Sequence, residues 1–319
     1  MKEVYYLDYY TTFECNLRCK HCFINWNKKS QLLYPNDIRK YFKFKTNHFA
    51  LTGGEITTRE DILDVTRACL ETVKTDTFVF ATNGILTERV LNTIKGSYDL
   101  FDKTNLFLFQ TSIEGKKETH EQIRGKGNFD RTIETIKKVT YLKEKIEKLK
   151  VNINFCVNHL NFRELKYVYD LSKKLNADSF SFLFKMPLQK NKFNENQLDI
   201  IERQIKSINK DRIANFKEIK NIDLKEMLSE IITLYIEENM VYASKHRRPI
   251  PCLAGKDYLT IAPNGDVIPC MMLHKNDILG NVKNLTDLKL ETKQCTKECN
   301  ECWCYSTAIP NIQMKINFS

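Results

Sequence analysis

The first 186 residues of this chain repeat one pattern, in which a short β-like run is followed by an amphipathic helix. This repeat constrains the fold more than any other feature, because strands joined through helices must run parallel. Runs such as TFVFA and LFLFQ are nearly all apolar, as expected for strands covered on both faces. We predict strands at 4–13, 48–52, 77–82, 106–113, 151–157 and 179–185, and helices near 35–44, 60–74, 87–95, 129–147 and 162–175, with Asn128 as an N-cap. These elements make six β/α units.

The rest of the chain changes character twice. Residues 187–245 are charged and helical in pattern, with apolar residues at helical spacing in 223–240, and are predicted to form a helical bridge. Residues 246–319 form a small cysteine-rich region, in which YLTIA and VIPC flank the turn at 263–266 and predict a β-hairpin. So small a unit is expected to need metal ligation for stability. We therefore predict three parts, 1–186, 187–245 and 246–319.

Composition and charge exclude several classes of protein. The formal net charge is +10, but lysines are spread along helix-like segments beside acidic residues, which is typical of solvated helix faces rather than of a nucleic-acid-binding arm. No window approaches the ~18 apolar residues of a membrane helix. The N-terminus lacks a hydrophobic signal core. We expect a cytoplasmic protein that binds neither membrane nor nucleic acid.

The cysteines fall into two groups. Nine of the eleven lie near one end or the other, and Cys69 and Cys156 stand alone, where core packing is the expected role. Disulfides do not persist in a reducing cytosol, so clustered thiols there indicate metal sites. The first group is Cys15, Cys19 and Cys22; the second is Cys252, Cys270, Cys295, Cys299, Cys302 and Cys304.

The first group forms a C-x3-C-x2-C run directly after the first predicted strand. Three thiolates so close together can bind three irons of a four-iron four-sulfur cluster and leave the fourth iron open to a small ligand. A structural zinc site is the alternative, but it needs a fourth ligand, and His21 between two cysteines is sterically cramped. At these residues the sequence resembles the radical S-adenosylmethionine (SAM) superfamily. The resemblance implies a partial barrel of six β/α units, with the cluster bound by this loop.

The resemblance also implies SAM contacts at the ends of the predicted strands. Gly53 and Gly54 would let the backbone approach the SAM ammonium, and Glu55 would supply the opposite charge. Ser112 would reach the ribose, and Glu114 stands where the family more often has Asp. Arg124 is similar to a basic residue near the SAM carboxylate or the substrate, with a surface arginine as the alternative. The remaining cofactor candidates are Asn83 and Asn158, the latter with a strand-ending Asn as the alternative.

The second cysteine group begins with Cys252-x12-Gly265-x4-Cys270, which resembles the opening of SPASM and twitch auxiliary-cluster domains. The later spacing departs from the full SPASM pattern, so we expect one auxiliary [4Fe-4S] cluster rather than two. Its ligands would be Cys252, Cys270, Cys299 and Cys302, with Cys295 and Cys304 as spare, alternative or substrate-facing thiols. Zinc ligation by two cysteine pairs is the alternative.

Together these features predict a radical SAM enzyme, an oxidoreductase or maturase that receives electrons from a reductant such as flavodoxin or ferredoxin. The resemblance implies reductive cleavage of SAM to a 5′-deoxyadenosyl radical, which removes a hydrogen atom from the substrate. The auxiliary cluster favours oxidation or cross-linking of a ribosomally made peptide. No leader-recognition domain precedes the barrel, so we expect the peptide to dock at 190–240 or on a partner protein. The alternatives are a dehydrogenase or cofactor-building enzyme for a small metabolite, a peptide epimerase with Cys156 as hydrogen donor, and a zinc-binding regulatory protein.

Overall fold

The computed structural model describes residues 1–24, 31–186, 192–215, 240, 243–245, 252–271 and 277–288. One curved sheet organises them, in the strand order β10-β9-β8-β2-β3-β4-β5-β6-β7, with β1 beside β3. All pairs from β2 to β7 are parallel. The strands are β1 (Lys2–Glu3), β2 (Tyr6–Tyr10), β3 (Phe44–Thr52), β4 (Lys74–Ala81), β5 (Leu106–Ser112), β6 (Leu149–Val157), β7 (Ser179–Phe184), β8 (Tyr258–Ile261), β9 (Asp266–Ile268) and β10 (Gly280–Asn281).

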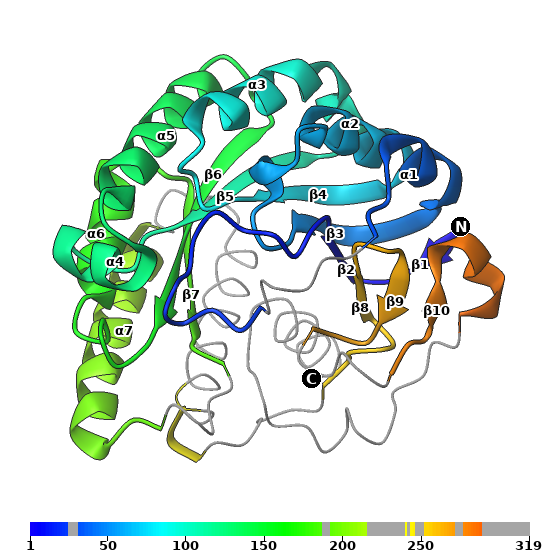
Figure 1. Cartoon of the computed structure of the whole chain (residues 1–319). Coiled ribbons are helices and arrows are strands. Elements are labelled where there is room, and N and C mark those ends of the chain that lie inside the picture. The colour runs from blue at the N-terminus through cyan, green and yellow to red at the C-terminus, as the bar shows by residue number, and fades with distance from the viewer. Residues whose placement is uncertain are drawn as a thin grey trace.

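The helices cover the outer, convex side of this sheet, as Figure 1 shows. They are α1 (Pro35–Tyr41), α2 (Ile62–Thr72), α3 (Thr87–Ser97), α4 (Lys117–Arg124), α5 (Asn128–Lys143), α6 (Leu165–Lys174) and α7 (Glu195–Asn215), with short 3-10 turns η1 (Ile56–Thr58), η2 (Tyr98–Lys103) and η5 (Val282–Asp287). The expected α/β fold with six parallel β/α strands is confirmed. The strands β3 and β4 begin a few residues earlier than the sequence pattern predicts.

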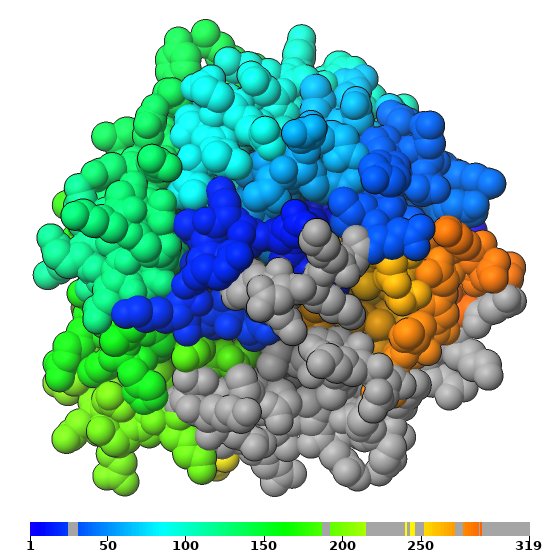
Figure 2. All heavy atoms as spheres, in the orientation of Figure 1, coloured from blue at the N-terminus to red at the C-terminus, as the bar shows by residue number. Residues whose placement is uncertain are grey.

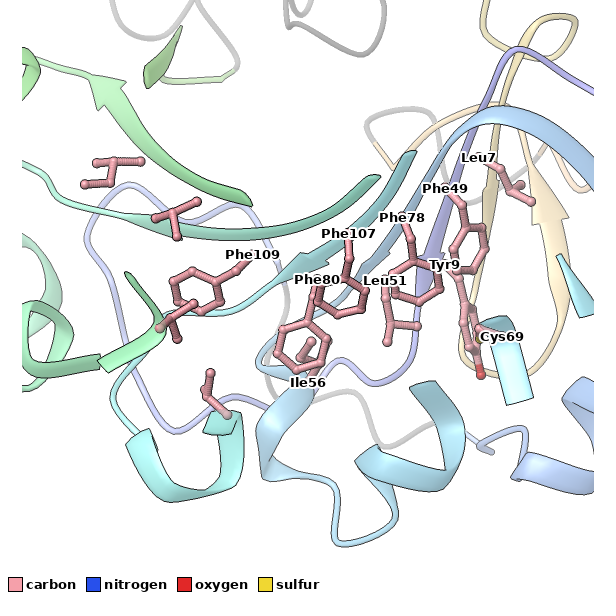
Figure 3. Packing of buried hydrophobic residues seen from close by; sticks show 14 of the residues in the cluster. Leu7, Tyr9, Phe49, Leu51, Ile56, Cys69, Phe78, Phe80, Phe107 and Phe109 are labelled. Atoms are coloured by element: carbon pink, nitrogen blue, oxygen red, sulfur yellow. The ribbon is translucent and has the colours of Figure 1, made fainter. Parts of the chain in front are cut away.

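The two faces of the strands differ, which corrects the expectation that both would be covered by apolar packing. Along β5 the burial alternates residue by residue, and Phe107 and Phe109 are fully buried while Leu108 and Gln110 are half-buried. Figure 3 shows the buried members packed on the side of the sheet that faces the helices. Successive side chains of a strand point to opposite faces, so the other set lines the concave side. The sheet therefore has one packed face and one face toward a cavity.

The expected cap of the helix after β5 is wrong. The α5 helix starts at Asn128 itself, and Gly127, with φ of 78°, occupies the cap position. The Asn128 carboxamide instead donates to the carbonyl oxygen of Arg124 at 2.9 Å. Glycine tolerates a left-handed φ without strain, so the tight turn between α4 and α5 is made by glycine rather than by a side-chain cap.

The predicted C-terminal hairpin is confirmed as β8 and β9, with Gly265 at φ of 89° in the turn. The β8 strand also pairs in parallel with β2, so the hairpin extends the barrel sheet at its first strand. In Figure 1 this hairpin, drawn in gold, lies beside β2. The hairpin is thereby held against the barrel by backbone hydrogen bonds. The three-part division of the chain stays a prediction, because most of 187–245 and 289–319 falls outside the described residues.

None of the helices in the described residues is long and apolar enough to cross a membrane.

Candidate active site: a cysteine loop at the mouth of the barrel

The three N-terminal cysteines lie in the loop that follows β2, and this loop crosses one end of the barrel (Figure 1). All three side chains are half-buried. The Cys22 N–H donates to the Cys19 carbonyl oxygen at 3.0 Å, and the Lys20 N–H donates to the Ile123 carbonyl oxygen at 3.0 Å, which fastens the loop to α4. In Figure 2 the blue N-terminal residues lie across the middle of the face shown. The loop is thus a structured, partly accessible element.

The chemistry of these thiols suits an iron-sulfur cluster. Burial, with a smaller contribution from the neighbouring cysteines, raises the pKa of Cys15 and of Cys22 to about 11. Thiols of such pKa become thiolates when a cation compensates their charge. In the part of the chain that the structure describes, no three His, Cys, Asp or Glu side chains converge as ligands of a single ion. A cluster binds each cysteine through a different iron, and this wider arrangement fits the loop better than one zinc ion does.

Gly53 and Gly54 bring the end of β3 against the same loop. The Gly54 N–H donates to the Thr12 carbonyl oxygen at 2.8 Å. A Cβ atom on Gly54 would lie 2.2 Å from the carbonyl oxygen of Glu14, one residue before Cys15. These glycines therefore approach the chain's own backbone closely, and their expected contact with the SAM ammonium stays a prediction. They set the position of the cysteine loop.

Glu55 is almost completely buried, at 2% exposed. Its Oε1 accepts from the Thr57 N–H at 3.0 Å, the Thr57 hydroxyl at 2.6 Å and the Thr82 hydroxyl at 2.6 Å. Its Oε2 accepts only from the Asn83 N–H, at 2.6 Å, among the described residues. Since a carboxylate oxygen has about two acceptor sites, Oε2 is the atom with capacity left for the SAM ammonium. Binding of that ammonium by Glu55 stays a prediction.

Glu114 and Arg124 form a buried ion pair behind the loop. Both Nε and Nη2 of Arg124 donate to Glu114 Oε1, at 3.0 and 2.6 Å. The other carboxylate oxygen accepts the Cys156 N–H at 2.9 Å, and His21 Nε2 lies 3.7 Å from Oε1. Burial raises the pKa of Glu114, but Arg124 and His21 outweigh it and hold that pKa below its usual value. The surface-arginine alternative is wrong, since only 11% of the Arg124 side chain is exposed.

The remaining cofactor candidates occupy three different settings. Asn83 is buried at the end of β4, and its carboxamide donates to Asn16 in the cysteine loop at 2.8 Å. Ser112 ends β5 and lies beside Asn154 of β6. Asn158 donates to the Cys156 carbonyl oxygen at 2.9 Å and accepts the Leu160 N–H, so its side chain organises a turn. Contact of these three residues with SAM stays a prediction.

Cys156 lies on the concave face of the barrel. Along β6 the residues Lys150, Asn152 and Asn154 line the cavity, and the period of two along a strand places Cys156 on the same side. Burial raises the pKa of Cys156 well above its usual value, and the charges that act on it include Glu114 and Cys22. Cys156 itself is not among the described residues that line the cavity, and its role as a hydrogen donor stays a prediction. Cys69, in contrast, is fully buried in the helical layer, as expected for core packing.

A cavity of about 880 Å³ lies along the concave side of the sheet and extends past β7 to Ser172 and Lys173 of α6. Phe23, next to Cys22, lines one part of it, and Cys270 and Met271 line another. Cys270 packs with Cys252 and Tyr258 in a small buried cluster. The polar wall of the cavity was not predicted, although the alternation of residues along each strand carries its signal. Its members are Asp8, His48, Gln110, Lys150, Asn152, Asn154, Ser179, Ser181 and Tyr258. Both cysteine regions therefore border one cavity.

The other proposed ligands of an auxiliary cluster, Cys295, Cys299, Cys302 and Cys304, lie outside the described residues.

Comparison with known proteins agrees with this geometry. The profile of the radical SAM superfamily matches residues 9–172, and that of an iron-sulfur cluster-binding domain, SPASM, matches residues 252–303. A probable GTP 3′,8-cyclase of Saccharolobus solfataricus is 27% identical over 279 residues, 85% of each chain. An Fe-coproporphyrin III synthase of Methanosarcina barkeri is 26% identical over 170 residues, 50% of this chain and 39% of the relative.

Two solved structures share the fold. The anSMEcpe structure with bound AdoMet superposes with a TM-score of 0.61 at 18% identity and covers 90% of this chain and 80% of its own. Streptococcus suis SuiB bound to its precursor peptide SuiA gives 0.60 at 18% identity, covering 96% and 73%. The domain match assigns a [4Fe-4S] cluster and SAM to the barrel and auxiliary iron-sulfur binding to the C-terminal region. The chain belongs to the radical SAM superfamily and carries a C-terminal SPASM domain.

Proposed function

We propose that this enzyme oxidises or cross-links a peptide at an unactivated carbon and passes the substrate's second electron to its C-terminal cluster. The observation that carries the proposal is the shared cavity, which is bordered by Phe23 beside the SAM-binding cysteines and by Cys270 of the SPASM hairpin. The bound cluster and SAM supply a hydrogen-abstracting 5′-deoxyadenosyl radical when an electron arrives. What the chain itself contributes is a pocket that holds the reacting carbon between two redox sites and excludes water.

The lining of the cavity supports a peptide substrate. Its volume is near the upper end of the roughly 300–1,000 Å³ typical of ligand sites. Carboxamide and hydroxyl groups on β5, β6 and β7 suit the amide groups of a peptide backbone. Three of the described residues that line the cavity are cationic, Lys150, Lys173 and Arg212, and Lys173 pairs with Asp211, so few cations are left for a triphosphate. Solved relatives of the same fold bind peptides, SuiA in SuiB and Cp18Cys in anSMEcpe.

A cofactor-building reaction on a purine nucleotide is the second candidate. It is favoured by the probable GTP 3′,8-cyclases, which align over 85% of this chain at 27–28% identity. Incubation of the reduced enzyme with SAM and GTP distinguishes the two. Consumption of GTP in step with 5′-deoxyadenosine formation would replace the peptide proposal, whereas SAM cleavage without nucleotide loss agrees with it.

The radical chemistry itself has a direct test. The reduced, anaerobic enzyme should convert SAM to 5′-deoxyadenosine, and replacing Cys15, Cys19 and Cys22 together by Ala should abolish this reaction while one cluster remains. The buried Cys69 offers a matched control, because Cys69→Ala should keep both the iron and the reaction. Stoichiometric zinc without sulfide in the wild-type protein would contradict the proposal.

We further propose one auxiliary cluster, bound by Cys252, Cys270, Cys299 and Cys302. Cys252 and Cys270 are buried together, which supports their half of the set. Single Cys→Ala variants analysed for iron should each lose about four irons at these positions. Equal loss at Cys295 or Cys304 would show that a different pair completes the site.

Epimerisation is the competing outcome of hydrogen abstraction, because the strand register places Cys156 on the concave side of β6 and a thiol can return a hydrogen atom. The two outcomes differ in product mass. Oxidation removes two hydrogens, whereas epimerisation in heavy water leaves the formula unchanged apart from one deuterium. Mass spectrometry should show the two-unit loss and no effect of Cys156→Ala on product mass. Deuterium incorporation that disappears in Cys156→Ala would favour the epimerase. We place this activity in the cytoplasm, with flavodoxin or ferredoxin as electron donor.

A further inference from the structure

Five polar side chains form a continuous row across the cavity wall. The row runs over β5, β6 and β7 at two adjacent levels of the sheet, where Gln110 is the register partner of Asn152 and Asn154 is the partner of Ser181. All of its members line the cavity: Gln110, Asn152, Asn154, Ser179 and Ser181. They come from three strands that are separated by helices in the sequence, so only the folded sheet brings them together.

The hydrogen bonds within this row branch from Asn152 to both neighbouring strands. Asn152 sits in the middle, where its Nδ2 donates to Gln110 Oε1 at 3.0 Å and to Ser181 Oγ at 2.9 Å. Its Oδ1 accepts from the Ser179 hydroxyl at 2.8 Å. The Ser181 hydroxyl then donates to Asn154 Oδ1 at 3.2 Å. Each carboxamide oxygen of the row is therefore bonded inside the row.

Two donors are left over at its ends. A carboxamide carries an acceptor oxygen and an NH2 group with two donors. The Nε2 of Gln110 and the Nδ2 of Asn154 have no hydrogen-bond partner in the described ranges, and neither residue is closed off from the cavity. Lys150 lies on the same face of β6, lines the cavity, and likewise has no ion-pair partner in the part of the chain that the structure describes. This wall therefore offers donors.

We propose that this row, the Gln110–Asn154 wall, binds a carbonyl or carboxylate oxygen of the substrate. It thereby determines which groups of the substrate reach the reaction centre. This inference rests on the proposed function, since it concerns the substrate of the same cavity. A strand rises ~3.3 Å per residue, which puts Asn154 roughly 7 Å from Cys156 and from the cysteine-loop end of β6. If the wall binds a substrate oxygen, the next few atoms of the substrate lie at the end of the barrel that the cysteine loop crosses. Hydrogen abstraction takes place at that end. Acceptor oxygens match the wall; donors such as ammonium groups do not.

The test uses small probes on the full-length, cluster-loaded, SAM-bound protein, observed by saturation-transfer NMR. Acetate offers a carboxylate, N,N-dimethylacetamide offers only a carbonyl, and methylammonium offers only donors. Gln110→Glu and Asn154→Asp each replace an NH2 donor by an acceptor oxygen of nearly the same shape. The double variant should bind acetate and dimethylacetamide at least tenfold more weakly, with an unchanged affinity for SAM. Gln122→Glu, the same change on the exposed side of α4, is the matched control and should bind as the wild type does.

Lys150→Gln distinguishes a carboxylate from a neutral carbonyl as the source of the bound oxygen. Weaker acetate binding with unchanged dimethylacetamide binding identifies a carboxylate partner, and no change for either probe identifies a neutral carbonyl. Three results would overturn the proposal: equal probe binding by the double variant and the wild type, no binding of either acceptor probe by the wild type, or preferential binding of methylammonium. Formation of 5′-deoxyadenosine by the same preparation reports on the proposed function separately, because it does not depend on this wall.

Discussion

The two faces of strands β2 to β7 carry different kinds of information. On the convex face, aromatic side chains such as Phe78 and Phe107 are fully buried against the helices. On the concave face the alternate residues border the cavity, and many of them, such as Gln110 and Asn152, are polar. Because neighbouring residues of one strand serve opposite faces, the same short segment encodes both stability and substrate chemistry. Substitutions one residue apart should therefore have different consequences.

The largest effect on stability is expected at Phe107. Its ring stacks on Phe101 with centroids 4.0 Å apart and on Phe78 at 5.3 Å. Phe107→Ala removes these contacts and leaves a void in a closed layer, which should lower the free energy of unfolding by about 3–5 kcal/mol. The urea midpoint, followed by circular dichroism, measures the loss.

The adjacent residue gives the matched control. Leu108 lines the cavity, so Leu108→Ala enlarges an existing space and should cost only about 1 kcal/mol. If the two variants lost equal stability, the division of the sheet into a packed face and a substrate face would be wrong.

The second effect on stability is expected at Arg124, near the carboxyl ends of the strands. Arg124→Met leaves the Glu114 carboxylate buried without its cation and should cost about 3 kcal/mol at neutral pH. In the wild type the pKa of Glu114 lies below 4.5, so its stabilising effect is present above that pH and is lost as the pH falls through the folded-state value. In the variant, burial alone acts and raises this pKa. Acidification should therefore raise the free energy of unfolding of the variant and lower that of the wild type.

Urea unfolding at neutral pH and at about pH 4 tests this sign. The stability gap between the wild type and Arg124→Met should narrow at the lower pH. The exposed pair of Arg67 and Asp99 provides the control, since Arg67→Met should change stability little at either pH. A gap that widened on acidification would contradict a charged, paired Glu114.

A smaller cost in stability, with a larger cost in cofactor, is expected at Gly54. Its Cβ would overlap the carbonyl oxygens of Phe13 and Glu14 just before the first cysteine. Gly54→Ala should destabilise the protein by about 1–3 kcal/mol, and the displaced loop should lose iron and SAM affinity. Gly96→Ala is the control, because its Cβ would meet only the flexible Leu63 side chain. Iron content and SAM binding equal to the wild type in Gly54→Ala would show that the loop does not depend on this contact.

How far the sequence predicts this molecule depends on the range of the interactions. The strands, the hairpin and the cysteine loop follow from local periodicity and spacing, and they lie close to where the sequence pattern expects them, with β3 and β4 beginning earlier. The Glu114–Arg124 pair involves two residues singled out as cofactor contacts, but their mutual contact depends on where α4 packs. The Gln110–Asn154 wall was missed altogether, because its hydrogen bonds require the register of three strands. Asn128 was misjudged for a related reason: the turn between α4 and α5 is set by glycines at positive φ.

The smallest expected change in stability is also the sharpest test of the comparison between faces. Ser181 accepts from Asn152 Nδ2 at 2.9 Å and donates to Asn154 Oδ1 at 3.2 Å. Ser181→Ala removes both bonds at a site where water from the cavity can replace them, so the loss should be about 0.5 kcal/mol. The Asn154 carboxamide is then free to turn its oxygen toward the cavity, which should weaken binding of dimethylacetamide severalfold.

Ser172→Ala provides the comparison for that measurement, because Ser172 also lines the cavity but its hydroxyl donates to the Tyr169 carbonyl oxygen within α6. It should leave probe binding unchanged. Ser181→Ala on the concave face would then change probe binding with little change in stability. Phe107→Ala on the convex face is expected to do the reverse. If Ser181→Ala instead lowered stability as much as Phe107→Ala, the polar row would be a structural element of the sheet, and the assignment of substrate recognition to this face would fail.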